Sequence, residues 1–279
     1  MTVAIVTDST AYLPDGAQAA GVRVVPLRVQ LGERTAIDGI DVTPEDVVRA
    51  LKERVRVSTS RPPPSEFAEA YQSCLDSGAD NVVSIHLSSA LSGTWESAVL
   101  ASQDFGYGVV RVVDSRSTAM GLGFAVLAAA AAARDGASAA EVQGAATAVV
   151  DRTRTLFYVD TLEYLRRGGR IGAAASLLAT SLSVKVLLQM VEGQIVGLEK
   201  VRTSSKAISR LVRLTREAAG NGPVDVAVHH LAAWSRAESI AQQLRDSLPG
   251  LGELYVGELG PVLGAHLGPG VLGTVVVRR

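Results

Sequence analysis

The chain has 279 residues, a formal net charge of -1 and 47% hydrophobic residues. This length suffices for one large domain or two ordinary ones, and the near-zero charge argues against a nucleic-acid partner, which would need a basic surface. A single cysteine excludes an intrachain disulfide framework, no basic segment precedes the first apolar run, and the longest uncharged stretch, Ser117 to Ala133, is shorter than a membrane span, so we expect a cytoplasmic protein without a membrane span.

The first half of the chain alternates apolar strand patterns with helix-start signals. Thr43-Pro44-Glu45-Asp46 and Ser138-Ala139-Ala140-Glu141 both have a hydroxyl cap and a carboxylate three residues later. We expect strands at Val3–Val6, Val22–Leu27, Val57–Ser60, Asn81–Leu87 and Val109–Val113, and helices from Thr43, over Ser65–Asp76, from about Gly93 to Phe105, from about Ala119, and from Ser138 to near Arg152. Repeated strand–helix units predict a mostly parallel sheet with helices on both faces.

The second half has a different pattern, which begins with two strands that flank Glu192-Gly193 and predict a hairpin. The strands expected here are Lys185–Met190, Ile195–Val201, Val224–Val228, Glu253–Leu259 and Val271–Val277, with helices over Lys206–Ala219 and Arg236–Leu248. We therefore expect an α/β protein of two domains. Residues 1–155 form a mostly parallel sheet with helices on both faces, and residues 156–279 form a smaller two-layer mixed sheet with helices.

Hydroxyl and carboxylate side chains follow most strands of the predicted parallel sheet. The carboxyl ends of parallel strands share one edge, and ligands bind there. The segments expected at this edge are Asp8-Ser9-Thr10, Thr59-Ser60, Ser88-Ser89, Ser92-Gly93-Thr94 and Asp114-Ser115. Each hydroxyl alone is explained as a helix cap, but together they indicate a polar ligand site.

Ser92-Gly93-Thr94 opens a helix, where backbone amides and the helix dipole favour an anion. Gly93 would let a ligand approach the backbone closely. No lysine follows, and the chain has no G-x-x-x-x-G-K-[ST] segment, so this is not an NTP-binding loop. A small anion such as a carboxylate fits the segment better.

His266 lies in the glycine-rich segment from Gly264 to Gly270, which we interpret as a loop. On such a loop the imidazole is free to face a ligand, and the glycines also have a purely conformational explanation. His229 and His230 end an expected strand and have no evident partner. Because the histidine and cysteine spacings match no metal-binding pattern, we expect no metal site.

Two groups of basic residues lie in the second half. Arg166, Arg167 and Arg170 surround Gly168-Gly169, and Lys200 and Arg202 lie at the end of an expected strand. Such groups are explained either as a solvated basic face or as a contact with a phosphate or an acidic partner.

These segments together resemble the DegV family of bacterial fatty acid-binding proteins. The resemblance runs almost end to end and rests on Asp8-Ser9-Thr10, Ser58–Pro62, Ser88–Thr94, Arg166–Arg170 and Gly264–Gly270. It implies two α/β domains that hold a long-chain fatty acid between them, with no catalysis by the protein itself and no cofactor.

The resemblance also implies roles for individual residues. Thr59 and Ser92 would bind the fatty acid carboxylate, Ser60 and Gly93 would support them, and His266 would approach the same head group. Some members present the acid to a separate fatty acid kinase, which phosphorylates it to an acyl phosphate. Arg170 and Arg202 are the candidates for the kinase-facing surface.

The chain departs from the family pattern at Ala90 and Trp95, around the serine motif, and in two further segments. Arg61-Pro62-Pro63 stands where the family often has Gln-Pro-Ser, and Lys185-Val186 stands where it often has Lys-Pro. The first of these segments places a cation near the head-group residues. These departures bear on the choice of head group and acyl chain.

The rival function is an enzyme that acts on a small acid. A serine hydrolase would use Ser92 and His266, but Ser92 is not in a G-x-S-x-G segment and His266 has no evident acidic partner. A nucleotide-dependent enzyme would use Gly121 and Gly123, although the third glycine of a dinucleotide fingerprint is missing. A DNA-binding regulator is a further alternative, against which the charge and the lack of a basic recognition helix argue.

Overall fold

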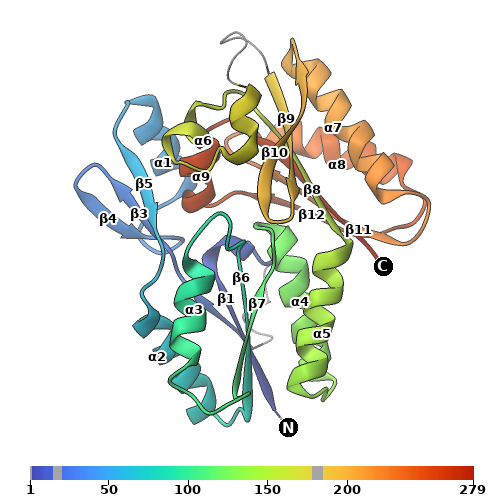
Figure 1. Ribbon diagram of the computed structural model, residues 1–279. Helices are drawn as coiled ribbons and strands as arrows, with labels where there is room; N and C mark the ends of the chain where they lie inside the picture. The colour runs from blue at the N-terminus through green and yellow to red at the C-terminus, as the bar shows by residue number, and fades with distance from the viewer. Residues whose placement is uncertain (1, 15–20, 178–184) are drawn as a thin grey trace. The chain divides into compact units, whose positions relative to one another are not determined.

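The computed structural model describes residues 2–14, 21–177 and 185–279 (Figure 1). The chain forms two compact units, the first from residues 1–28 and 60–151 and the second from residues 29–59 and 152–279. The predicted division lies at residue 155, whereas the second unit begins at Arg152 and also includes the segment Val29–Thr59. This segment carries helix α1, which packs on helix α9 near the C-terminus.

The first unit is built on a four-stranded parallel sheet with the strand order β2-β1-β6-β7. Its strands are β1 (Val3–Asp8), β2 (Val22–Val25), β6 (Asn81–His86) and β7 (Val110–Asp114). Its helices are η1 (Ser9–Ala11), α2 (Pro64–Asp76), α3 (Thr94–Ser102), α4 (Met120–Arg134) and α5 (Ala139–Arg152). All four strands run in the same direction, so their carboxyl ends share one edge.

Helices cover both faces of this sheet, as predicted. Val6 and Val82 point to one face, where they pack with Phe67 and Tyr71 of α2 and with Ala98 of α3. Because side chains alternate along a strand, the intervening residues point to the opposite face, and α4 contacts β1 and β6 as well. Figure 1 shows α3 and α4 on opposite sides of β1, β6 and β7.

The second unit is built on a six-stranded mixed sheet with the order β10-β9-β8-β13-β11-β12. Its strands are β8 (Thr153–Val159), β9 (Lys185–Val191), β10 (Gln194–Val201), β11 (Val224–His230), β12 (Leu251–Glu258) and β13 (Leu272–Arg278). The pair β11–β12 is parallel, and the other pairs are antiparallel. With six strands this sheet is wider than the first.

One face of the mixed sheet is covered by α7 (Ser204–Ala219) and α8 (Trp234–Ser247). Leu211 of α7 and Ile240 of α8 are fully buried against Tyr158, Leu187 and Val226 of the sheet. The unit also contains a three-stranded sheet with the order β4-β3-β5. Its remaining elements are β3 (Arg28–Leu31), β4 (Arg34–Ile37), α1 (Pro44–Lys52), β5 (Val57–Ser60), α6 (Glu163–Arg167), η2 (Gly172–Leu177) and α9 (Pro261–Leu267).

The predicted α/β class is confirmed, and the predicted strands and helices are found within a few residues of their expected ends. Both capping boxes are present: the Thr43 side chain accepts from the Asp46 amide, and the Ser138 amide donates to Glu141 at 2.8 Å. The hairpin around Glu192-Gly193 is also confirmed. No helix in the described ranges is long and apolar enough to cross a membrane.

Three strands were not predicted. β3 and β4 flank Gly32, which has a positive φ of 60° and whose amide donates a hydrogen bond to the Arg56 carbonyl. β8 begins directly after α5 with no glycine or proline between them, so the usual boundary signal is missing. Its run of β-branched and aromatic residues, Thr153 to Val159, is the signal that could have revealed it.

Candidate functional site

The structure brings two of the predicted head-group residues into direct contact. Thr59 on β5 and His266 on α9 both belong to the second unit, and Thr59 Oγ1 lies 2.7 Å from His266 Nε2. The two residues are 207 positions apart in the chain. This hydrogen bond orients the imidazole, and it places a hydroxyl and a ring nitrogen side by side.

The prediction that His266 lies on a loop is wrong, because residues Pro261–Leu267 form helix α9. Pro261 occupies the first turn, where its missing N–H costs nothing. Gly264 lies inside the helix, and close packing favours a glycine there, because a Cβ would lie 3.1 Å from the Leu231 side chain. Gly268 ends the helix with a φ of +75°, which favours glycine.

The two glycine-rich segments of the second unit pack on each other, since α6 contacts α9. A Cβ on Gly168 would lie 2.1 Å from His266 Nδ1, and a Cβ on Gly268 would lie 2.1 Å from the Tyr164 ring. These glycines therefore admit the neighbouring rings. Tyr164 is not among the residues predicted from the sequence, and no local pattern in the chain indicates its contact with Gly268.

His266 is electrically neutral at physiological pH. Its pKa is lowered to about 4, mainly because burial disfavours the imidazolium and also because the Arg170 guanidinium is close. Its Nδ1 is buried and has no hydrogen-bond partner among the described residues. Nε2 is already hydrogen-bonded to Thr59. The neutral imidazole can help to position a polar head group, but it carries no charge to attract one.

Arg170 is half-buried near His266, which the sequence alone did not indicate. Its Nη1 donates to the Gly168 carbonyl at 2.6 Å, which holds the guanidinium beside Gly168. Arg202 is exposed, in the turn between β10 and α7. The two predicted partner-facing arginines thus have different surroundings.

The other basic residues of the segment have a local explanation. Arg166 donates twice to Glu163, at 2.8 Å each, and Arg167 donates once, at 2.7 Å. Both arginines are exposed, and they lie on the same short helix as their shared partner, Glu163. Arg166 and Arg167 are therefore a solvated ion-pair cluster.

The remaining head-group residues belong to the first unit. Ser92 Oγ lies 2.8 Å from Thr94 Oγ1, and Gly93 caps helix α3 without a side-chain hydrogen bond. Ser60, the last residue of β5, is exposed. The Arg61 guanidinium lies over Gly93, where an added Cβ would be 1.8 Å from Nη1. Arg61 thus places a cation beside Ser92 and the start of α3, as the departure from the family pattern suggested.

Most other hydroxyls at this edge of the sheet are committed to loop structure. Ser89 Oγ donates to Asp114 at 2.6 Å, the Ser9 hydroxyl accepts from the Leu27 amide at 3.1 Å, and Ser115 Oγ donates to the Ser117 carbonyl at 3.2 Å. The predicted convergence of hydroxyls is therefore largely structural. Ser92 differs, because its described partner is another hydroxyl.

The first unit contains a buried chain of polar side chains. Tyr71 donates to Ser84 at 2.9 Å, Ser84 Oγ lies 2.6 Å from His86 Nε2, and His86 Nδ1 lies 3.1 Å from Asp8. The order Ser–His–Asp is that of a hydrolase triad. However, these four residues have 0% exposure, so no substrate reaches the serine. These hydrogen-bonded side chains therefore form a structural network.

The residues of the predicted enzyme alternatives have structural explanations. In the described ranges no carboxylate hydrogen-bonds to His266, whose Nε2 meets Thr59 instead. Gly121 and Gly123 lie inside α4 and not before it. A Cβ on Gly123 would lie 2.7 Å from the Ala11 carbonyl, so close packing explains that glycine.

The comparisons with known proteins agree over the whole chain. The model of the DegV family matches residues 2–279. A DegV domain-containing protein of Streptomyces coelicolor is 52% identical over 278 residues, which is 99% of each chain.

Two solved structures are similar over the full length. A DegV family protein from Thermus thermophilus, described for its fatty acid binding, has a TM-score of 0.95 at 35% identity, with 100% of both chains covered. DegV from Bacillus subtilis, described as a fatty acid binding protein, has a TM-score of 0.90 at 34% identity, again with 100% of both chains covered.

Proposed function

Because the chain belongs to the DegV family, we propose that it binds a long-chain fatty acid and presents the acid to a fatty acid kinase. The supporting observation is its full-length similarity to two proteins described as binding fatty acids. The contact of Thr59 with His266 adds a preformed polar pair at positions that the family pattern assigns to the head group.

The proposed carboxylate ligands are hydroxyl side chains. Thr59 and Ser92 donate to the carboxylate, and Ser60 and Gly93 shape its surroundings. His266 is neutral, since its pKa is about 4, and therefore contributes a hydrogen bond without a strong ion pair. A head group held in this way is oriented, and it can still be released or modified.

The acyl chain supplies most of the proposed binding energy. Each buried methylene contributes roughly 0.8 kcal/mol, so a chain of palmitate length offers above about 10 kcal/mol before ordering costs. Val, Leu, Ile and Ala dominate the interior of this protein, and such side chains suit an aliphatic ligand. The absence of catalytic turnover stays a prediction.

Extraction of the purified protein tests this function. The protein is isolated under non-denaturing conditions, extracted with organic solvent and analysed by mass spectrometry. We expect about one long-chain fatty acid per protein chain. A stoichiometric nucleotide, or an extract without lipid from protein that also fails to bind added fatty acid, would contradict the proposal.

Handover to a kinase is tested with Arg170→Ala. Arg170 is bonded to the Gly168 carbonyl and lies near the neutral His266 imidazole, and its charge suits the extra negative charge that phosphorylation adds to the acid. We expect the variant to copurify with normal lipid and to support slower acyl phosphate formation with a cognate kinase. Added salt should slow the wild-type reaction, because partly exposed charges are screened.

Arg167→Ala is the matched control, since Arg167 is a neighbouring arginine paired with Glu163, and it should transfer at the wild-type rate. Arg202→Ala separates the exposed arginine from the half-buried one and should slow transfer without loss of lipid. If Arg170→Ala loses its lipid and transfers normally per bound acid, then Arg170 belongs to the carboxylate site and the assignment to the kinase contact is wrong.

A further inference from the structure

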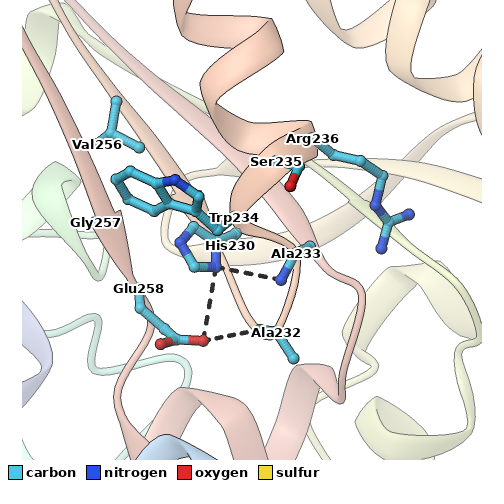
Figure 2. Close-up of a pocket in the computed structure, with 9 residues that line it drawn as sticks. All are labelled: His230, Ala232, Ala233, Trp234, Ser235, Arg236, Val256, Gly257 and Glu258. Atoms are coloured by element: carbon cyan, nitrogen blue, oxygen red, sulfur yellow. Dashed lines mark hydrogen bonds and ion pairs between the residues drawn. The ribbon is translucent and has the colours of Figure 1, made fainter.

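A pocket of about 760 Å³ lies within the second unit, at the carboxyl ends of the parallel strands β11 and β12 (Figure 2). Its walls come from the ends of these strands and from the start of α8, which connects them. In such a strand–helix–strand unit, ligands bind outside the carboxyl ends of the strands. None of the residues assigned above to the fatty acid or to the kinase lines this pocket.

His230 lines the pocket with a buried hydrogen-bonding group that has no partner. The Ala233 amide donates to Nδ1 at 3.4 Å, and Glu258 Oε1 lies 3.6 Å from the same nitrogen, beyond hydrogen-bond distance. With the amide bonded to the lone pair of Nδ1, Nε2 carries the proton of the neutral ring. The His230 side chain is only 4% exposed, and Nε2 has no hydrogen-bond partner among the described residues. Burial lowers the pKa of His230, and the nearby Glu258 carboxylate opposes this shift only in part. An unmet buried donor is costly unless a ligand supplies an acceptor.

Trp234 covers the same side of the pocket with a large exposed ring. It is the first residue of α8 and is 57% exposed. Its ring meets the His230 imidazole edge to face, with ring centroids 5.6 Å apart. Figure 2 shows the indole beside His230, on the side away from Ala233 and Glu258. An exposed indole next to a buried N–H is a stacking surface for a flat ring that also accepts a hydrogen bond.

Glu258 ends β12 and is the register partner of His230. It accepts the Ala232 amide at 2.8 Å, and its side chain remains 33% exposed. In nucleotide-binding units of this topology, an acidic residue beyond the first strand and helix binds the ribose hydroxyls. Glu258 occupies the corresponding place, at the end of the second parallel strand.

The loop between β11 and α8 offers little to a phosphate. The amides of Ala232 and Ala233 already donate to Glu258 and His230. Arg236 points away from His230 and Trp234 in Figure 2, and its charge acts on Asp160. Among the described lining residues, the pocket therefore presents the flat Trp234 ring, the His230 N–H, the Ser235 hydroxyl and the Glu258 carboxylate, and the Arg236 cation is directed away from His230 and Trp234.

We propose that this pocket binds the nucleoside part of a ribonucleotide. The base stacks on Trp234 and accepts a hydrogen bond from His230 Nε2, while the ribose hydroxyls donate to Glu258. Recognition of the nucleoside, and not of the phosphate, follows from the occupied loop amides and the negative charge of Glu258.

Isothermal titration calorimetry of the full-length protein with adenosine, 2′-deoxyadenosine and AMP tests the proposal. We expect adenosine to bind at least as tightly as AMP, and 2′-deoxyadenosine to bind about tenfold more weakly because it lacks a hydroxyl for Glu258. Trp234→Ala should weaken adenosine binding roughly ten- to a hundredfold. His230→Phe, which keeps a ring but removes the N–H, should weaken it about five- to tenfold.

Ser239→Ala, on the exposed side of α8, is the control and should bind adenosine like the wild type. Trp234→Ala should keep its normal fatty acid content, so a failure here is distinct from a failure of the proposed function. The proposal is overturned if adenosine gives no heat at millimolar concentration, or if it binds Trp234→Ala and wild type equally. It is also overturned if no nucleoside binds and Trp234→Ala instead weakens binding of the kinase, because the ring then serves a protein contact.

Discussion

Replacing Asp8 by alanine is expected to lower the free energy of unfolding by about 3–5 kcal/mol. The Asp8 carboxyl group is fully buried and accepts from the Thr10 amide at 3.0 Å, the Thr10 hydroxyl at 2.6 Å, the Leu87 amide at 2.9 Å and His86 at 3.1 Å. Alanine leaves all of these buried donors without an acceptor. The hydrogen bonds that link His86 to Ser84 and Tyr71 then lose the acceptor that orients His86.

Urea unfolding at neutral pH, followed by circular dichroism, measures this loss. Asp104→Ala is the control, because Asp104 is an exposed aspartate in the same unit, and its removal should change the free energy of unfolding by less than about 0.5 kcal/mol. Asp8→Asn retains the size but places an amide N–H₂ against donors, so it should be nearly as destabilising as alanine. Equal stability of Asp8→Ala and Asp104→Ala would show that the network contributes nothing.

Ser92→Ala is expected to weaken fatty acid binding roughly ten- to a hundredfold and to leave the fold intact. A hydrogen bond to a charged acceptor contributes about 1.5–3 kcal/mol. Ser92 is only half-buried, and its described partner is the Thr94 hydroxyl at 2.8 Å. Thr94 is fully buried, and the loss of this neutral hydrogen bond costs about 0.5–1.5 kcal/mol of stability, which leaves the protein folded. The free energy of binding should therefore fall by more than the free energy of unfolding.

Titration with a fluorescent fatty acid measures this effect. Ser102→Ala, at the other end of α3, is the matched control, because the Ser102 hydroxyl donates to the Val99 carbonyl. Thr59→Val should reduce the affinity as Ser92→Ala does, and it should also release His266 from its hydrogen bond. If Ser92→Ala binds as tightly as Ser102→Ala, then Ser92 does not contact the head group.

Local sequence patterns were reliable wherever neighbours in the chain determine the structure. The capping boxes at Thr43 and Ser138 depend on residues three positions apart, and both formed as expected. The hairpin at Glu192-Gly193 depends on its own turn and flanking strands. In these cases the hydrogen bonds and the residues that make them lie within one short segment, so the sequence contains the whole interaction.

The same patterns were incomplete where a segment takes its structure from distant neighbours. β8 pairs with β13 and β9, and no turn marks its start. The glycines around His266 suggested a loop, yet Gly264 belongs to a helix, where the Leu231 side chain packs against it and leaves little room for a Cβ. A glycine has the same letter whether it serves a turn or a close contact, and only the neighbouring element distinguishes the two.

The sequence by itself determined the α/β class, the alternation of strands and helices, and the identity of the hydroxyl, histidine and arginine side chains that suit a carboxylate. The tertiary structure decided which of them meet. It joined Thr59 to His266 across 207 positions, brought Arg170 close enough to lower the pKa of His266, and buried Asp8 in a polar network. The physical reason is that hydrogen bonding, burial and electrostatic interaction depend on distances in space, which strand pairing and helix packing set and which the spacing of residues along the chain does not.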